Sequence, residues 1–530
     1  MIRVPQEFQL GLRFIARLPA FLKHPWSIEQ AKASLQDRFE RREDRFLAML
    51  RVGVFHNARS PYRPLMKHAG CELGDISRMA AQDGVEGALN ALLQAGVFIS
   101  VDEFKGRRPV VRGTTAMDVS PEMFRNPMSR FHVPMKSGGS RSRGTPVVFD
   151  LDFIRECALD TGLALQARGG DAWRKATWEV PGGGALFSLL EFSQFGAKPA
   201  RWFSQIDPGG KGLHPRYRWS GRAFLWGAGL ARIPMPAPEY VSLENPLPIV
   251  RWMEESVKAG QTPYLLTYPS SALRVCQAAE RAGIDLSGAH FTIAGEPCTP
   301  TRLAAIRRSG ASVLPKYGIM ETGPVAYGCH NPAAPDDMHF LSDLHALIQP
   351  DARDADGRLP PHTVLFTSLA VSAPLVLLNV SMGDQAALVR RRCHCPLEGL
   401  GWAVHVHSVR SQEKLTCGGM NFLDADVAHV LDDVLPARFG GNPTDYQILE
   451  DESPDGSPVV KLLIHPKLGE LDERRVVSEF LREVGRAGSA QAIMGRAWDE
   501  AGLVRVERSI PRTTPSGKIL HLHVDPSERP

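Results

Sequence analysis

The stretch HFTIAGEPCTPTRLAAIRRSGASVLPKYGIMETG, residues 290–323, carries the pattern of the fold in one unit. Its run HFTIAG predicts a strand, PTRLAAIRRSG predicts a helix that ends at glycine, and ASVLPKYG predicts a second strand. A strand, a helix and a strand in succession are typical of a parallel sheet covered by helices. Because parallel sheets bind ligands at the carboxyl ends of their strands, the loops IAGEPCT and YGIMETG are expected at a binding edge.

Strand and helix patterns alternate in the same way from about residue 145 to residue 380, whereas residues 27–100 have the spacing of helices. After Ser411 the pattern starts again with a helix, the strand VVKLLIHP and a further helix. We therefore expect an α/β fold with a large N-terminal domain, residues 1–410, built on helix-covered, mostly parallel sheets. Residues 411–530 are expected to form a small, mobile C-terminal α+β domain.

The composition is that of an ordinary globular protein, with 43% hydrophobic and 23% charged residues. A formal net charge of +4, without a Lys/Arg block, argues against nucleic acid as a partner. The sequence has no run of about 18 apolar residues, so no stable membrane insertion is expected. The basic N-terminus is interpreted as a surface helix, with a membrane-surface role as the alternative. Eight cysteines in 530 residues form no disulfide framework, and the expected compartment is the cytoplasm.

A glycine- and serine-rich loop, KSGGSRSRGTP, begins at Lys136 and leads into the strand candidate TPVVFDL. Its glycines let the backbone approach a phosphate closely, and its hydroxyl and basic side chains add donors and positive charge. A flexible connector is the alternative, because no Gly-Lys-Ser/Thr pattern opens a helix here. A further glycine-containing loop, PRTTPSGKIL, covers residues 511–520 near the C-terminus.

Taken together and in this order, KSGGSRSRGTP, YGIMETG and PRTTPSGKI resemble the motifs of the adenylate-forming superfamily, which includes acyl-CoA synthetases, luciferases and adenylation domains. Within it, the sequence looks most like the phenylacetate–CoA ligase branch, and the resemblance runs from about Ser60 to the end. It implies an ATP-dependent ligase that converts a small carboxylic acid to acyl-AMP and pyrophosphate. The implied acceptor of the acyl group is a thiol, either coenzyme A or the phosphopantetheine of an acyl carrier protein.

Two other functions stay open at this point. One is adenylation followed by amide or ester ligation, or by AMP transfer to a cofactor. The other is an inactive nucleotide-binding homologue. The identity of the acid and the oligomeric state, with a homodimer as one option, are open as well.

The resemblance also implies roles for single residues. Lys518, Glu321 and Thr322 are the expected catalytic residues: the lysine supplies positive charge during adenylation, the acid coordinates Mg²⁺ and the threonine lies beside the α-phosphate. Asp384 is expected to bind the ribose hydroxyls and Tyr317 to lie near the adenine. The other residues expected around ATP or AMP are Ser137, Gly138, Gly139, Ser140, Gly144, Thr145, Gly295, Glu296, Pro297, Gly318 and Arg410.

One segment departs from the family pattern, and a second segment has two possible interpretations. HSVRSQEKL aligns with the family's Gly-Arg-x-Asp-Asp hinge and places Arg410 at the family arginine, but Val409 replaces the glycine and Gln412 with Glu413 replaces the acid pair. This departure weakens the expectation for the second half-reaction more than that for adenylation, because the small domain rotates about the hinge between the two steps. Residues 181–196 correspond to the region that shapes the acyl pocket; its aromatic residues either line that pocket or belong to the core, and they are Phe187, Phe192 and Phe195.

Cysteine and histidine residues cluster after the YGIMETG loop and in RRCHCPLEG. Cys-x-Cys is a compact metal clip, and three cysteines with one histidine form a tetrahedral, structural zinc set. Some members of the phenylacetate–CoA ligase branch carry a similar set, and here Pro396 stands where they have glycine. The expected zinc ligands are Cys329, His339, Cys393 and Cys395. The alternatives are buried free thiols, or a fourth ligand drawn from His330, His345 and His394.

Overall fold

The computed structural model describes most of the chain. The described residues are 4–130, 133–136, 146–180, 182–207, 215–296, 298–350, 359–360, 362–411, 415–417, 420–422, 427, 429–442, 445–455, 457–486, 495–496, 498–512 and 522–523.

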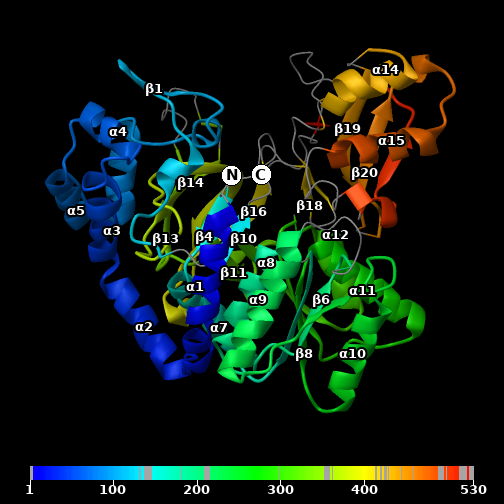
Figure 1. Cartoon of the computed structure of the whole chain (residues 1–530), viewed down its shortest axis with the longest axis horizontal. Helices are drawn as coiled ribbons and strands as arrows, with labels where there is room; N and C mark the ends of the chain where they lie inside the picture. Colours follow the sequence, from blue (N-terminus) through cyan, green and yellow to red (C-terminus); the bar gives the residue numbers. More distant parts are fainter. Residues whose placement is uncertain are drawn as a thin grey trace.

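One sheet of twelve strands forms the centre of the described part of the chain (Figure 1). Its first half is parallel throughout, in the order β7-β6-β5-β8-β9-β10. These strands are β5 (Arg174–Glu179), β6 (Arg201–Ser204), β7 (Pro238–Tyr240), β8 (Pro263–Thr267), β9 (His290–Ile293) and β10 (Ser312–Ile319).

The second half of the sheet continues from β10 in the order β11-β12-β16-β15-β14-β13, with antiparallel pairing. These strands are β11 (Gly323–Gly328), β12 (Met338–Phe340), β13 (His345–Ile348), β14 (Thr363–Ser368), β15 (Val380–Arg390) and β16 (Val404–Ser411). β10 belongs to both halves, because Ser312 to Pro315 pair with β9 and Lys316 to Ile319 pair with β11. The sheet therefore changes from parallel to antiparallel within the predicted strand ASVLPKYG.

Helices cover both faces of the parallel half. Alternate residues of β8 enter two different cores: Leu265 packs with residues of α10, α11 and α12, whereas Tyr264 and Leu266 pack with Leu165 and Phe192 on the other side. These alternations follow from the period of two along a strand, and burial on both faces explains why the strands are continuous apolar runs. The covering helices are α7 (Leu151–Gln166), α8 (Gly183–Ser193), α10 (Leu247–Lys258), α11 (Pro269–Ala282) and α12 (Pro300–Arg308). The expected helix-covered α/β fold is confirmed.

Local sequence sets the helix ends near the binding edge. α12 begins with a cap in which the Thr299 side chain accepts a hydrogen bond from the Arg302 backbone, and Pro300 occupies the first helical position. α11 ends at Gly283 in the left-handed conformation, with φ of 67°, where a residue without Cβ is favoured.

The N-terminal part of the chain is helical, as expected; α2 to α5 lie on the left of Figure 1, whereas α1 lies near the middle, beside α9. α1 packs against α9 so closely that a Cβ added to Gly227 would lie 2.7 Å from the Leu18 side chain. Within the described residues, no helix has the length and apolar character needed to cross a membrane. The elements of this region and the short hairpin that follows are α1 (Val4–Lys23), α2 (Ile28–Glu40), α3 (Arg42–Leu50), α4 (Tyr62–Ala69), α5 (Leu73–Gln94), α6 (Val101–Phe104), β1 (Val110–Arg112), β2 (Thr115–Met117) and α9 (Pro215–Ala231).

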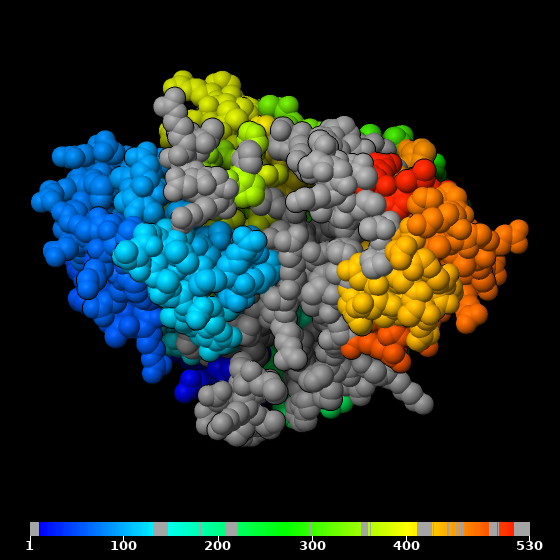
Figure 2. Space-filling view, turned by 90° about the horizontal axis from the view of Figure 1, so that it is seen from above, coloured from blue at the N-terminus to red at the C-terminus, as the bar shows by residue number. Residues whose placement is uncertain are grey.

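A smaller unit with a sheet of its own follows the large sheet. Its strands lie in the order β21-β20-β19-β22. Its elements are α14 (Leu435–Phe439), β19 (Tyr446–Glu452), β20 (Pro458–Ile464), α15 (Glu473–Arg486), β21 (Val504–Glu507) and β22 (Leu522–His523). Seen from above in Figure 2, this unit (orange to red) and the N-terminal helices (blue) lie on opposite sides of the molecule.

The small unit contacts the large one through α11. Gln277 Nε2 donates a 2.9 Å hydrogen bond to Asp455 Oδ2, and Arg274 Nη2 donates to the Ala501 carbonyl at 3.3 Å. A cavity of about 400 Å³ lies beside these contacts, lined from both units by residues that include Glu244 and Asp499. Apolar side chains join the two units as well, because one buried core contains residues of α10 and α11 together with Trp498 and Leu503 of the small unit.

Candidate functional site

The loops after β8, β9 and β10 leave the sheet at one edge. Thr267 and Ile293 are paired residues at the ends of β8 and β9, and Ile293 is paired with Pro315 in β10. The predicted binding loops that follow these strands therefore meet at the carboxyl edge of the parallel half, where α/β sheets bind ligands.

The YGIMETG loop is a bulged hairpin between β10 and β11. The strand register shifts between Tyr317 and Gly318. A Cβ added to Gly318 would lie 3.0 Å from the Gly323 carbonyl oxygen, so the close approach of the two backbones favours glycine. Thr322 closes the turn through its backbone N–H, which donates to the Ile319 carbonyl at 3.2 Å.

Two acids lie beside this hairpin. Tyr317 Oη donates a 2.7 Å hydrogen bond to Asp384 Oδ2, which joins β10 to β15 although three other strands lie between them in the sheet. Burial, and then the Asp384 carboxylate, raise the pKa of Tyr317 well above its usual value, so the phenol stays a donor. Glu321 is 7% exposed, and no described residue makes a hydrogen bond with its carboxylate. A carboxylate without a protein partner suits a Mg²⁺ ligand.

In the IAGEPCT loop, the Glu296 side chain holds the loop against the start of α11. The Glu296 carboxylate accepts hydrogen bonds from the Ser270 backbone N–H at 2.9 Å and from the Ser270 hydroxyl at 2.7 Å, and it pairs with Arg302 at 3.5 Å. It thereby satisfies the first turn of α11. Gly295 has φ of 83°, and a Cβ added there would lie 3.2 Å from the Tyr268 ring. The loop and Tyr268 thus form one packed wall of the edge.

Arg410 lies at the end of β16, and its neighbour Ser411 is paired with Asp384 in β15. Its guanidinium pairs with Asp336 at 3.4 Å, and the same carboxylate accepts the backbone N–H groups of Ser408 and Val409 at 2.9 and 3.0 Å. Asp336 therefore holds the segment that leads into the small unit.

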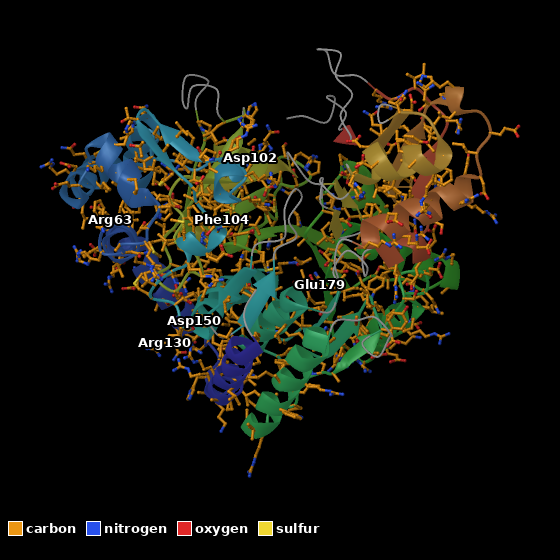
Figure 3. The ribbon with its side chains drawn as sticks, turned by 45° about the horizontal axis from the view of Figure 1, so that its top comes forward. Arg63, Asp102, Phe104, Arg130, Asp150 and Glu179 are labelled. Atoms are coloured by element: carbon orange, nitrogen blue, oxygen red, sulfur yellow. The ribbon has the colours of Figure 1, made fainter. Side chains whose placement is uncertain are left out.

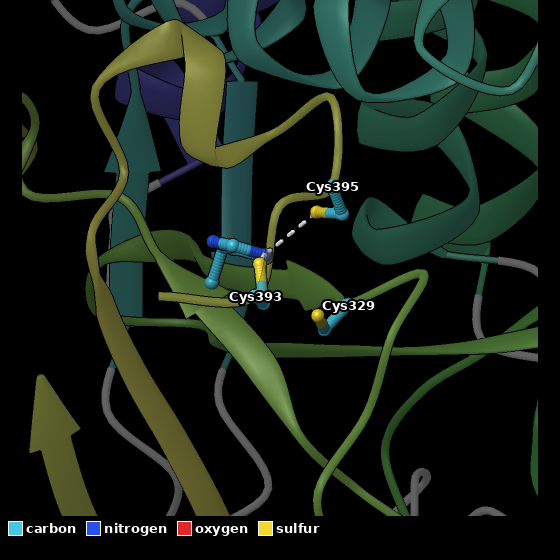
Figure 4. Close-up of side chains that lie close together, drawn as sticks. Cys329, Cys393 and Cys395 are labelled. Atoms are coloured by element: carbon cyan, nitrogen blue, oxygen red, sulfur yellow. Dashed lines mark hydrogen bonds between the residues drawn. The ribbon is translucent and has the colours of Figure 1, made fainter. Parts of the chain in front are cut away.

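The four expected zinc ligands come together from three parts of the sheet. Cys329 follows β11, His339 lies in β12, and Cys393 and Cys395 follow β15. Their ligand atoms all lie within 4.8 Å of one another and all four residues are buried; Figure 4 shows the three cysteines side by side. His339 Nε2 lies 3.1 Å from Cys395 Sγ and 3.5 Å from Cys393 Sγ. Zinc bonds of about 2.0 Å to nitrogen and 2.3 Å to sulfur place such atoms about 3.5 Å apart, so the donor set fits the ion.

Neighbouring groups orient this centre. His339 Nδ1 lies 2.6 Å from the Trp402 carbonyl oxygen and donates to it, which leaves Nε2 with a free lone pair toward the sulfur atoms. The Asn331 backbone N–H donates to Cys329 Sγ at 3.4 Å. Of the alternative histidines, His345 directs Nε2 to the Pro324 carbonyl at 2.9 Å, away from this set.

A group of charged side chains at the end of β5 was missed by the sequence reasoning. Glu179 is the last residue of β5, and the buried atom Oε2 has no hydrogen-bond partner among the described residues. Lys316, in β10, pairs with the buried Glu191 of α8 at 3.2 Å. The sequence pattern that could have indicated this group is an acid at the end of a strand, followed closely by the glycines 182–184.

With this geometry established, the chain can be compared with known proteins. It matches the solved structure of 2-hydroxyisobutyryl-CoA ligase in complex with 2-HIB-AMP and CoA, with a TM-score of 0.56 and 14% identity, over 92% of this chain and 90% of that chain. The chain has the fold of a CoA ligase. The same ligase in a post-adenylation state matches with a TM-score of 0.44 and 14% identity, over 94% of this chain and 90% of that chain.

A mutant amide bond synthetase from Marinactinospora thermotolerans matches with a TM-score of 0.42 and 15% identity, over 90% of this chain and 92% of that chain. No protein-family model and no curated protein matches the sequence.

Some predicted site residues of this CoA-ligase fold lie outside the described residues. They are Ser137, Gly138, Gly139, Ser140, Gly144, Thr145, Pro297 and Lys518. The strands on either side of the glycine-rich loop, β3 (Val133–Lys136) and β4 (Pro146–Phe149), pair antiparallel. Arg512 is anchored before the C-terminal loop by two hydrogen bonds with Gln447, at 2.7 and 3.0 Å.

The three aromatic residues of the expected acyl-pocket segment belong to the core. Phe187, Phe192 and Phe195 are 8%, 1% and 2% exposed. Phe192 packs edge-on against Tyr264, with ring centres 5.6 Å apart, and Phe187 packs edge-on against Phe149 at 5.0 Å. Phe187 and Phe192 lie in the buried helix α8 and Phe195 follows it, so of the two readings left open above the structure favours the core.

Proposed function

We propose that the protein is an ATP-dependent, AMP-forming ligase that adenylates a carboxylic acid and passes the acyl group to a thiol. The observation that carries the proposal is the Tyr317–Asp384 hydrogen bond beside the Glu321–Thr322 turn, at the carboxyl edge of a sheet with the CoA-ligase fold. The three matching sequence motifs support it independently. They also favour the phenylacetate–CoA ligase branch, which we propose as the subtype.

In the first half-reaction, a carboxylate oxygen of the acid would attack the α-phosphorus of ATP. The new oxygen–phosphorus bond gives acyl-AMP, and the bond to the bridging oxygen breaks so that pyrophosphate leaves with its electron pair. Both reactants are anionic, so positive charge aimed at the reacting phosphate stabilises the transition state. Lys518 would provide such a charge. Glu321 would hold Mg²⁺, which supplies further positive charge to the phosphates when bound.

The nucleotide itself would be held by neighbouring groups. Asp384 is oriented by the hydrogen bond from Tyr317 and would accept hydrogen bonds from the ribose hydroxyls. Thr322 would lie beside the α-phosphate, and the backbone of Gly295 and Gly318 would border the base. The glycine-rich loop that contains Gly138, Gly139 and Gly144 would cradle the phosphates, with the hydroxyls of Ser137, Ser140 and Thr145 as donors.

In the second half-reaction, a thiolate would attack the acyl carbon and AMP would leave. We propose coenzyme A or a carrier-protein phosphopantetheine as the thiol; an amine acceptor is the second candidate. We further propose that residues 1–410 and 411–530 act as separate domains, because the strands β19 to β22 form a sheet of their own beside the twelve-stranded sheet. The retained acids Glu321 and Asp384 argue against an inactive homologue. The cytoplasm remains the proposed compartment.

We also propose that Cys329, His339, Cys393 and Cys395 bind a structural zinc ion. Four buried donors around one point leave no position for a substrate, which is the arrangement of a closed, structural site. The ion would tie the loop after β11 to the loop after β15, and so would brace the antiparallel half of the sheet beneath Asp384.

The proposed function is tested by following both products. Purified protein with ATP and Mg²⁺ is incubated with single carboxylic acids, and acyl-AMP is detected by mass spectrometry. Coenzyme A, a phosphopantetheinylated carrier protein or an amine is then added separately. Thioester formation with one of the thiols supports the proposal; accumulation of amide alone, with no thioester, would replace the thiol by an amine as acceptor.

A further inference from the structure

Glu179 is an unsatisfied acid at the proposed reaction edge. It ends β5, where its neighbour Trp178 is paired with Thr267 at the end of β8. The Oε2 atom is buried and finds no hydrogen-bond partner in the part of the chain that the structure describes. A buried carboxylate without a partner is costly, and natural proteins retain such groups mainly where a ligand or ion completes them.

The charges around Glu179 do not balance. Glu191 is fully buried and satisfied, because Thr161 Oγ1 donates to it at 2.8 Å and Lys316 Nζ pairs with it at 3.2 Å. Lys316 is 11% exposed on its side chain, and its one positive charge is directed to Glu191. The group of Glu179, Glu191 and Lys316 therefore contains two carboxyl groups and one ammonium group, and it lacks one positive charge.

The titration behaviour of Glu179 agrees with this imbalance. Burial and, to a smaller extent, the Glu191 carboxylate raise the pKa of Glu179 to about 7, against the opposing effect of the Lys316 ammonium. The phenols of Tyr264 and Tyr268 are both buried near Glu179, and neither supplies a charge to neutralise it. The carboxyl group is thus able to ionise near neutral pH when a cation is placed beside it.

This acid lies next to the residues of the proposed adenylation site. Lys316 precedes Tyr317 in β10, and Tyr268 packs under Gly295, where an added Cβ would lie 3.2 Å from its ring. α8 begins four residues after Glu179, and a Cβ added to Gly184 in its first turn would meet no atom within 4 Å. Glu179 lies near the middle of the molecule in Figure 3. Besides burial, the carboxylates of Glu179 and Glu296 both raise the pKa of the Tyr268 phenol, so Glu179 lies near the same phenol as the IAGEPCT loop of the proposed site.

We propose that Glu179 binds an ammonium group of the substrate, so that the protein adenylates a carboxylic acid that carries a basic amine, such as an amino acid. This inference rests on the proposed adenylation of carboxylic acids and specifies its substrate class. A cation supplies the missing charge and hydrogen-bond donors together. A hydroxyl group supplies a donor alone, and a methyl group leaves the carboxylate unpaired.

The test uses matched acids that differ at one position. Alanine, lactate and isobutyrate form one set, 4-aminobutyrate, 4-hydroxybutyrate and valerate a second, and 4-(aminomethyl)benzoate, 4-(hydroxymethyl)benzoate and 4-ethylbenzoate a third. In each set the group changes from ammonium to hydroxyl to methyl at nearly constant shape. Acid-dependent exchange of pyrophosphate into ATP gives kcat/KM for each acid.

We expect the ammonium member of at least one set to exceed both of its partners by about ten- to a hundredfold, the usual effect of a charged hydrogen bond. Glu179→Gln should remove that advantage, so that the ratio of kcat/KM between the ammonium acid and its hydroxyl and methyl partners falls to about one. Glu179→Asp, which keeps the charge, should retain part of the advantage. Glu254→Gln, at a partly exposed acid paired with Lys258 on α10, is the matched control and should change none of these values.

Each outcome decides the inference. Exchange that is equal or faster with hydroxyl or methyl acids, or an ammonium preference that survives in Glu179→Gln, overturns the role of Glu179 and leaves the adenylation proposal standing. Absence of exchange with any acid, from protein that melts cooperatively, contradicts the proposed function and with it this inference. Comparison of the melting curves shows whether Glu179→Gln is folded.

Discussion

Tyr317 Oη and Asp384 Oδ2 are joined by a 2.7 Å hydrogen bond that connects the parallel edge of the sheet to a strand of its antiparallel half. β16, β12 and β11 lie between the two strands in the sheet order, so the sheet curves to bring them together. The bond fixes the direction of a carboxylate that is buried. A nucleotide bound at this edge would meet an acid that is already oriented.

Asp384→Ala should therefore raise KM for ATP by about ten- to a hundredfold, because a charge-assisted hydrogen bond contributes about 1.5–3 kcal/mol. Tyr317→Phe is the matched variant: it removes only the bond that orients the acid and should raise KM by a few fold. The measurement is pyrophosphate release as a function of ATP concentration. A KM in Asp384→Ala within twofold of the wild-type value would refute the ribose-binding role.

Purified protein should contain about one zinc ion per chain, because the four donors are close enough to share one ion. Cys393→Ser should lose most of that zinc and melt at a lower temperature, since the loops after β11 and β15 would no longer be joined. Elemental analysis and thermal melting measure the two effects. Cys157→Ser makes the same change at a buried cysteine of α7, outside the cluster, and should keep the metal. Equal zinc content in both variants would rule out this site.

Glu179 should make stability fall as pH rises. Burial raises its pKa from 4.5 in the unfolded reference to about 7 in the folded protein. The folded state then holds the proton more tightly, so the stabilisation is fully present below pH 4.5 and is lost as the pH passes through 7. Between pH 5 and 8, Glu179→Gln should gain on the order of 2–3 kcal/mol in free energy of unfolding relative to wild type, at about 1.4 kcal/mol per unit of pKa. Parallel pH profiles from urea denaturation would show that Glu179 is not desolvated.

Periodicity in the sequence was sufficient for the parallel half of the fold. HFTIAG, PTRLAAIRRSG and ASVLPKYG became β9, α12 and β10, because strands buried on both faces are apolar throughout and the helix ends have clear capping residues. The change of direction within β10 could not be predicted, since it depends on pairing with β11 and β9 at once.

The sequence likewise predicted some features of the candidate site and missed others. Cys329, His339, Cys393 and Cys395 are separated by up to 66 positions; their residue types, the Cys-x-Cys spacing and the family resemblance marked them as a group, and the structure brings them together. The cap formed by Glu296 and the Lys316–Glu191 pair had no sequence signal, because each depends on which face of a strand a side chain occupies. A resemblance at the level of motifs identifies loops, and side-chain direction comes from tertiary packing.

Lys518→Ala should separate the two half-reactions. Loss of one well-placed stabilising donor commonly costs about 2.7–4 kcal/mol, or 10² to 10³ in rate, so adenylation should slow by that factor. Thiolysis of chemically supplied acyl-adenylate should stay nearly normal, because pyrophosphate has already left before this step begins. Single-turnover assays of each step measure the split. Equal loss in both steps, from folded protein, would mean that Lys518 does not serve adenylation.

The central claim, that the protein activates a carboxylic acid by adenylation, is tested most directly by exchange of labelled pyrophosphate into ATP. The reverse of the first half-reaction incorporates the label without any acceptor. We predict exchange that requires both Mg²⁺ and a carboxylic acid and that is lost in Glu321→Ala. Folded wild-type protein that gives no exchange across the acid panel, or exchange that is independent of added acid, would contradict the account.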